Sequence, residues 1–370
     1  MRIVIATTSA FHLRHLAREL IAMGRDVTYM SYLPKFRIRR DRIPLAHARS
    51  YFLRLQPWST AALFRRLPSL QQCAVEAMFA RTDEAFARDL PPCDVFIGLS
   101  AMAVESARVA RRKYGAKVIL ERGSRHISSQ VELLSVGGQR PSAGYVAREL
   151  AGYEIADCIA LPSTHAVESF VERGFDPARL FRNPYGVDFA TFAPSPRPEG
   201  PLRLLFVGSW SYQKGCDALA AVLRADPNLT LTHVGTPGDL AFPALANFTS
   251  LGHKTHQELG AVMARHHVLL LPSRQDGFGM VLAEALACGL PVIGSAMTGA
   301  PDLRAAIGDK EAVTVVEPAN AAALAGAIRE MAEFVRRKPA DRRVLTDDDR
   351  ANLSWTAYAR RYDAFLRTIV

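Results

Sequence analysis

The stretch between Val268 and Ile293 most constrains what this chain can fold into. It opens with the apolar run Val268–Leu271, which ends at a proline and so favours a buried strand. A helical pattern begins at Met280 and ends at Gly289, and the proline two positions later prevents its continuation. Val292 and Ile293 then begin another apolar run. Strand, glycine-rich turn, helix and strand in this order predict an α/β fold with a parallel sheet.

The turn inside this stretch is suited to a ligand. Gly277 and Gly279 flank Phe278, so the backbone can turn sharply and approach a bound molecule. The following helix N-terminus offers free N–H groups and partial positive charge, which favour a phosphate. Asp276 precedes the helix and Glu284 lies about one turn inside it; ionised carboxylates accept several hydrogen bonds from sugar hydroxyls. On spacing alone, a helix-capping aspartate and a solvated glutamate fit equally well.

The remainder of the 370 residues alternates between strand-like and helix-like patterns, and this length favours two domains. Because ligands of doubly wound sheets bind beyond the strand C-termini, residues 7–12 and 121–126 are expected at the functional edge. His126 in the second loop is a candidate site residue, and a buried structural histidine is the alternative interpretation. The proline-rich segment 193–201 predicts a linker. We therefore expect domains at 1–192 and 202–352, with a closing helical segment at 353–370.

A second loop with phosphate-binding character follows the strand predicted at 202–207. It reads Gly208-Ser-Trp-Ser-Tyr-Gln-Lys214-Gly215, and a lysine beside a glycine at a strand-to-helix turn is well placed to contact a phosphate. A surface lysine at an ordinary turn is the alternative interpretation.

These motifs resemble one family. The sequence from Asp276 through Glu284 to Pro291 resembles the E-x7-E signature of retaining glycosyltransferases of family 4, also described as glycosyl transferases group 1. Here the first acid is aspartate. The Gly208–Gly215 loop resembles the family's G-R-x4-K-G loop, with Ser209 in place of the arginine, and Asn183–Asp188 resembles the interdomain segment. The Gly-Gly pair common after the first strand is replaced by Thr7–His12.

The resemblance implies the GT-B fold, with two Rossmann-like domains facing across a cleft and a C-terminal helix returning to the first domain. It implies a nucleotide-diphosphate sugar held by the second domain and a glycan, lipid-linked or small-molecule acceptor held by the first, in bacterial polysaccharide or glycoconjugate synthesis. The configuration at the anomeric carbon would be retained by same-face attack, with the leaving phosphate taking the acceptor proton. No resident cofactor is implied, and since no Asp-x-Asp motif is evident we expect metal independence.

The resemblance also assigns roles to residues. Lys214 and the helix N-terminus would stabilise the leaving diphosphate, Glu284 would bind the ribose, Asp276 a sugar hydroxyl, and His126 would lie near sugar and acceptor. Because Ser209 carries no charge, an arginine elsewhere is expected to replace the missing one, and the candidates are Arg274, Arg122 and Arg125. The full expected donor-binding set is Ser209, Gly252, His253, Lys254, Arg274, Phe278, Gly279, Met280, Val281, Arg122 and Arg125.

The net charge of +10 is concentrated in residues 31–70, where nine Lys/Arg face the single acid Asp41. Aromatic and aliphatic residues are interleaved with these charges, which favours contact with an anionic membrane; a solvated basic surface is the alternative. Nucleic acid is not expected, because no recognition motif accompanies the charge. The five scattered cysteines indicate thiols in a reducing compartment, and no signal peptide is evident. A cytoplasmic protein is expected, with the membrane's inner face as its site of contact.

Two other functions fit the same residues. One is a different GT-B activity, such as a nucleotide-sugar epimerase or a phosphorylase, although no pyridoxal-lysine motif supports the latter. The other is a non-catalytic subunit that binds a nucleotide sugar for a partner enzyme, because the expected arginine and glutamate are absent at positions 209 and 276.

Overall fold

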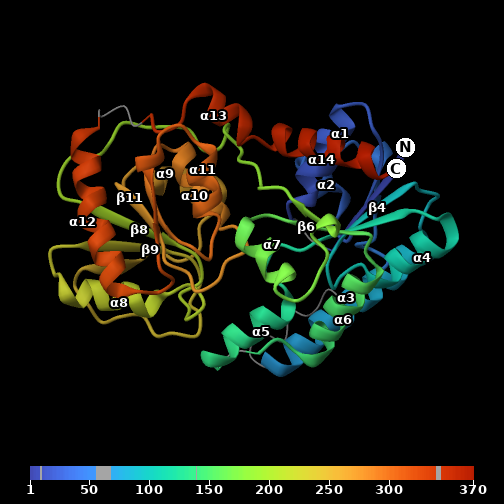
Figure 1. Ribbon diagram of the computed structural model, residues 1–370, viewed down its shortest axis with the longest axis horizontal. Helices are drawn as coiled ribbons and strands as arrows, with labels where there is room; N and C mark the ends of the chain where they lie inside the picture. The colour runs from blue at the N-terminus through green and yellow to red at the C-terminus, as the bar shows by residue number, and fades with distance from the viewer. Residues whose placement is uncertain (9–10, 56–67, 139, 339–342) are drawn as a thin grey trace.

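The protein consists of two α/β halves, each built around one parallel sheet (Figure 1). The computed structural model describes residues 1–8, 11–55, 68–138, 140–338 and 343–370. Residues 56–67, which belong to the basic stretch identified in the sequence, lie outside the described residues. Among the helices described, each is too short or too polar to cross a bilayer.

The first half holds a seven-stranded sheet in the order β3-β2-β1-β4-β5-β6-β7. Its central strands are buried on both faces, which is why they read as continuous apolar runs in the sequence. The strands are β1 (Arg2–Thr7), β2 (Asp26–Ser31), β3 (Ala48–Ser50), β4 (Val95–Leu99), β5 (Lys117–Glu121), β6 (Cys158–Leu161) and β7 (Leu180–Arg182). The helices are α1 (Leu13–Ala22), α2 (Lys35–Arg40), α3 (Pro68–Arg88), α4 (Val104–Tyr114), α5 (Ile127–Val136), α6 (Ala143–Ile155) and α7 (Thr164–Val171).

The second half holds a six-stranded sheet in the order β10-β9-β8-β11-β12-β13, with every pairing parallel. Its strands are β8 (Arg203–Val207), β9 (Thr230–Val234), β10 (Phe248–Ser250), β11 (Val268–Leu271), β12 (Val292–Ser295) and β13 (Val313–Val316). Its helices are α8 (Cys216–Ala225), α9 (His256–Met263), α10 (Met280–Ala287), α11 (Ala300–Ala306), α12 (Ala321–Arg337) and α13 (Asp347–Asn352).

The last helix, α14 (Trp355–Ile369), leaves the second half and packs beside α1 (Figure 1). Arg25, just after α1, donates two hydrogen bonds to the Asp363 carboxylate at 2.6 and 2.8 Å. The predicted return of a C-terminal helix to the first half is therefore confirmed, and the chain has the expected GT-B architecture.

Both sheets reverse their strand order at an interior pair of strands. In the first sheet the reversal lies between β1 and β4, and in the second between β8 and β11. The loops after β1, β4 and β5 therefore face the turns after β8 and β11 across the boundary between the halves, as the switch-point rule predicts.

The strand, turn, helix and strand expected between Val268 and Ile293 are observed as β11, α10 and β12, and the strand expected at 202–207 is β8. Among the elements not predicted are the helices α2, α3, α5, α6, α7, α11 and α12 and the strands β3, β7, β10 and β13. Two of these helices, α5 and α6, show little separation of apolar and polar faces along their sequences. The cysteines at 93, 158, 216 and 288 are buried free thiols, as expected.

Candidate active site

A cavity of about 520 Å³ lies between the two halves. The first half contributes residues from the loops after β1, β4 and β5, and the second contributes the turn after β11 and part of α10. The interdomain segment and the start of α14 close the remaining side through Tyr185, Gly186 and Trp355. Both predicted functional loops of the first half therefore reach one cavity.

The second half's wall contains an ion pair between two residues predicted for the donor. Lys214 Nζ donates to Asp276 Oδ2, although 62 residues separate them, and each side chain is about one-fifth exposed. Asp276 lines the cavity, whereas Lys214 contacts Asp276 and is not itself among the lining residues. The structure thus places the lysine of one motif against the acid of the other.

Gly279 begins α10 in the left-handed region, with φ of 69°. A Cβ at this position would lie 2.5 Å from Leu271 Cδ2, so glycine is required by both conformation and space. The N-cap residue Gly279 has no side chain to cap α10, and no side-chain cap is found there among the described residues. The backbone N–H groups of this helix terminus are therefore available beside the Lys214–Asp276 pair, where a phosphate is favoured.

Glu284 lies one turn further along α10 and lines the same cavity. Its side chain is 9% exposed, and His256 Nε2 lies 3.9 Å from Oε1. Burial raises the pKa of Glu284 to about 7, because removal from water disfavours the charged form. A buried carboxylate facing a cavity is suited to accept hydrogen bonds from ligand hydroxyls.

Direct contacts join the two halves beside Gly123, which lines the cavity. A Cβ at Gly277 would lie 1.7 Å from the carbonyl oxygen of Gly123, so the two backbones meet with no room for a side chain. Ser163 Oγ donates to the Gly277 carbonyl at 2.6 Å, and Thr164 N donates to Asp302 at 3.1 Å. The halves are therefore closed on one another around the cavity.

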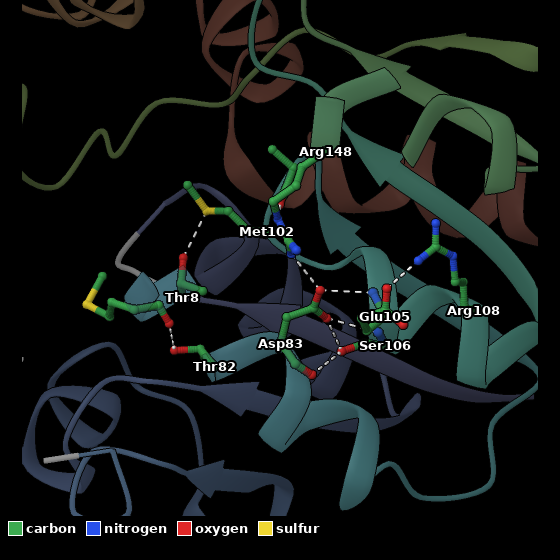
Figure 2. Close-up of polar contacts among 10 residues, drawn as sticks. Thr8, Thr82, Asp83, Met102, Glu105, Ser106, Arg108 and Arg148 are labelled. Atoms are coloured by element: carbon green, nitrogen blue, oxygen red, sulfur yellow. Dashed lines mark hydrogen bonds and ion pairs between the residues drawn. The ribbon is translucent and has the colours of Figure 1, made fainter. Parts of the chain in front are cut away.

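The loop after β4 forms part of the opposite wall and is held by a buried acid (Figure 2). Asp83 accepts hydrogen bonds from the backbone of Ser106 at 2.9 Å and from Arg148 at 2.7 Å. Arg148 in turn donates to the carbonyl of Ala101, whose φ of 61° is unusual for a residue with a side chain. This arrangement fixes the loop that presents Ser100 and Met102 to the cavity.

His126 does not line the cavity. It is the N-cap of α5, where its Nδ1 accepts a hydrogen bond from Ser128 N at 3.2 Å, and its ring packs against Tyr153, Phe170 and Phe175. Burial, followed by the charges of two arginines, lowers the pKa of His126 to about 4. This geometry supports the structural alternative for His126 and places a different histidine, His12, in the cavity wall.

The three arginines expected to replace the missing one occupy different places. Arg274 lies over the Tyr212 ring and forms two hydrogen bonds with Asp217, at 2.6 and 2.7 Å, so its charge is already paired. Arg125 lies outside the cavity lining and reaches Met297 Sδ at 3.5 Å. Arg122 does line the cavity, although it is buried and paired with Glu149 at 2.6 Å.

Some of the remaining residues predicted to bind the donor line the cavity, and the others do not. Phe278, Gly279 and Met280 line the cavity, with Phe278 almost fully buried. Gly252 follows β10 and accepts a hydrogen bond from Gly235 N at 3.0 Å. The other members of the set lie outside the lining: Ser209, Gly252, His253, Lys254 and Val281.

Sequence reasoning missed several residues that line the cavity. The most notable are His12 and Glu121, which pair with each other, together with Tyr185 and Arg14. The sequence places these residues at strand C-termini and in the interdomain segment. Such positions identify the loops that reach a ligand, but they do not identify which side chains in those loops contact it. In the described part of the chain, no group of His, Cys, Asp and Glu is arranged to hold a metal ion.

Two facing Rossmann-like halves, a cavity at their switch points and a phosphate-type turn in the second half define the GT-B class. Residues 201–333 match the family described as Glycosyl transferases group 1. This match lies in the second half, where the motifs of the donor turn indicated the same family.

Relatives and solved structures agree with this class. Glycogen synthase of Mycobacterium tuberculosis is 35% identical over 200 residues, which cover 49% of this chain and 48% of that relative. The alignment thus spans about half of each protein. Sucrose-phosphate synthase of Thermosynechococcus elongatus has a TM-score of 0.70 at 20% identity, covering 100% of this chain and 99% of that one. Anabaena HepE in complex with UDP-glucose has a TM-score of 0.69 at 14% identity, covering all of both chains.

Proposed function

We propose that the protein is a retaining glycosyltransferase that moves a sugar from a nucleotide-diphosphate sugar to a hydroxyl acceptor. The observation that carries this proposal is that Asp276, the uncapped N-terminus of α10 and Glu284 line one wall of one cavity, with Lys214 paired to Asp276. It combines a cation, free backbone N–H groups and a buried carboxylate. These are the groups required by a diphosphate and a neighbouring ribose.

The groups act at different stages of transfer. Negative charge grows on the diphosphate as its bond to the anomeric carbon breaks, and preorganised donors lower the barrier most where charge develops. Lys214 and the first N–H groups of α10 are those donors. Glu284 accepts hydrogen bonds from the ribose, and Asp276 from a sugar hydroxyl. Arg122 and Arg14 line the cavity and are the arginines proposed to replace the charge missing at Ser209, although Arg122 is paired with Glu149 and Arg14 lies 3.4 Å from Asp41.

Retention and metal independence complete the proposal. The acceptor attacks on the face that the diphosphate leaves, so the configuration of the anomeric carbon is kept. Lys214 and the helix terminus supply the charge stabilisation that a metal ion provides in other transferases. The acceptor, a glycan, lipid-linked or small molecule of bacterial glycoconjugate synthesis, binds against the wall formed by the first half.

We also propose that the first half contacts an anionic membrane in the cytoplasm. Phe36 on α2 is 69% exposed and Leu53 is 84% exposed, and exposed basic residues surround Phe36 on the same short helix. Apolar side chains among positive charges favour an anionic lipid surface.

The test is donor turnover by the purified protein. Release of nucleoside diphosphate from UDP-glucose, GDP-mannose and ADP-glucose is measured, and NMR follows the configuration of the released or transferred sugar. Glu284→Ala is expected to lower turnover by at least about 10²-fold, because donor hydroxyls lose their acceptor. Glu330→Ala, at an exposed position of α12, is the control. If wild type turns over a donor and Glu284→Ala does so at the same rate, the site assignment is wrong. If wild type binds a donor without turning it over, the non-catalytic subunit is favoured.

A further inference from the structure

Two neighbouring contacts join the loop after β8 to the donor turn after β11. Gln213 Nε2 donates a hydrogen bond to Gln275 Oε1 at 2.8 Å. The next residue of each segment forms the ion pair between Lys214 and Asp276. The backbone supports the first contact, because Arg274 N donates to the Gln213 carbonyl at 2.8 Å. The loop and the turn are therefore held to each other at two consecutive positions.

The same glutamine also reaches the first half. Gln275 Nε2 donates to Ser124 Oγ in the loop after β5. Gln275 is 1% exposed, whereas Ser124 lines the cavity. Beside this contact the backbones of Gly277 and Gly123 meet, where the halves are closed on one another. One buried amide thus binds the second half through its oxygen and the first half through its nitrogen.

This amide makes the position of the lysine depend on closure. A buried amide without its partner loses a hydrogen bond that water does not replace, so the Gln275 side chain is best satisfied when the halves are closed. Its orientation then fixes the acceptor that Gln213 contacts. Lys214 follows Gln213 directly and carries its charge on a flexible stem. A shift of the loop at Gln213 therefore displaces the ammonium group of Lys214.

We infer that Gln275 is a positioning residue that aligns Lys214 and Asp276 with the closed cavity. The inference rests on the proposed glycosyl transfer and names the residue through which closure of the halves affects the leaving diphosphate. Negative charge grows on the diphosphate as its bond to the anomeric carbon breaks, and a displaced cation stabilises that charge less. Gln275 acts through its neighbours, because it does not itself line the cavity.

The test measures kcat and KM for the donor among UDP-glucose, GDP-mannose and ADP-glucose that wild type turns over. Gln275→Met keeps the length of the side chain and removes both of its hydrogen bonds. It is expected to lower kcat at least about tenfold with KM within about threefold, because Glu284 and the N-terminus of α10 still hold the donor. Ser124→Ala removes only the contact with the first half and is expected to lower kcat about fivefold. Ser124→Thr, which keeps the hydroxyl, is expected to retain the wild-type kcat.

A double-mutant cycle distinguishes positioning of Lys214 from a general structural role. When Lys214→Ala is already present, Gln275→Met is expected to change kcat by less than about twofold, because no ammonium group remains to be aligned. A further loss of about tenfold in that background shows that Gln275 acts independently of Lys214 and overturns the inference. If the Lys214→Ala rate is too slow to follow, calorimetric affinity for the nucleoside diphosphate replaces kcat in the same four proteins, with the same pattern expected.

The control is Gln257→Met, at an exposed position of α9 outside the cavity lining, and its kcat is expected to match wild type. Each variant is accepted as folded if the donor raises its melting temperature as in wild type. A folded Gln275→Met with wild-type kcat overturns the inference and leaves the proposed function intact. Absence of turnover by wild type with all three donors overturns both. If Gln275→Met fails to fold, Ser124→Ala decides, and a wild-type kcat there refutes the inference.

Discussion

Glu284 is expected to make the ligand-free protein less stable as pH rises. Its pKa is raised from the ordinary 4.5 to about 7 by burial, so the folded state binds the proton more tightly than the unfolded chain. The stability that this protonation contributes is complete below pH 4.5 and is lost as pH rises to 7. Above pH 7 the fold holds an ionised carboxylate away from water. Glu284→Gln removes the titration and keeps nearly the same shape.

The magnitude follows from the pKa difference. At about 1.4 kcal/mol per pKa unit, the ionised form costs the fold about 3 kcal/mol. An unfolding entropy of about 2.1 cal/mol/K per residue gives about 0.8 kcal/mol per degree for 370 residues. Above pH 7, Glu284→Gln is therefore expected to melt about 4 °C higher than wild type.

The assay is the melting temperature of both proteins without ligand between pH 4.5 and 8.5. The difference is expected to be small at the acid end, to grow toward pH 7 and then to stay constant. Asp363→Asn is a control of opposite sign, because Arg25 lowers the pKa of the Asp363 carboxyl and the pair stabilises the fold at neutral pH. A difference between Glu284→Gln and wild type that does not change with pH would refute the burial argument.

Three further predictions concern closure, charge and the membrane. Gly277→Ala is expected to lower turnover by at least about tenfold, because its Cβ would meet the Gly123 carbonyl oxygen at 1.7 Å and hold the halves apart. If the variant turns over donor as fast as wild type, this contact is dispensable. Arg274→Ala is expected to keep turnover within about threefold, since Asp217 already neutralises it; a loss as large as that of Lys214→Ala would make Arg274 a donor contact. Replacing the basic residues of α2 with glutamine is expected to abolish sedimentation of the protein with anionic vesicles at low salt, whereas the same change on α4 should not. If the wild-type protein sediments equally with neutral and anionic vesicles, recognition of an anionic membrane is contradicted.

The donor wall was predictable because its signals are local in sequence. The glycines at 277 and 279, the helix after them and the glutamate one turn inside α10 lie within a single strand–turn–helix unit. The backbone rules that govern such a unit act over a few residues. The same rules located the loops after β1 and β5, because both follow apolar strands of one sheet.

The opposite wall was not predictable at the level of side chains. His12 and Glu121 are 109 residues apart, and only the sheet order brings β1 and β5 near a common edge. His126 belongs to the expected loop, but aromatic residues from α6 and the α7 region surround its ring away from the cavity. Arg274 was a candidate cation until the fold placed Asp217 against it. Long-range pairing decides which charges and rings a ligand meets, and one sequence does not contain that information.

The central claim is that one cavity holds a nucleotide-diphosphate sugar through Lys214 and Glu284. Calorimetric titration of the intact protein at pH 8 with UDP-glucose, GDP-mannose and ADP-glucose tests it most directly. The account predicts that at least one donor binds and that Lys214→Ala and Glu284→Ala each weaken it about tenfold or more, while Arg274→Ala binds like wild type. Donor binding of unchanged affinity in both Lys214→Ala and Glu284→Ala would contradict the account.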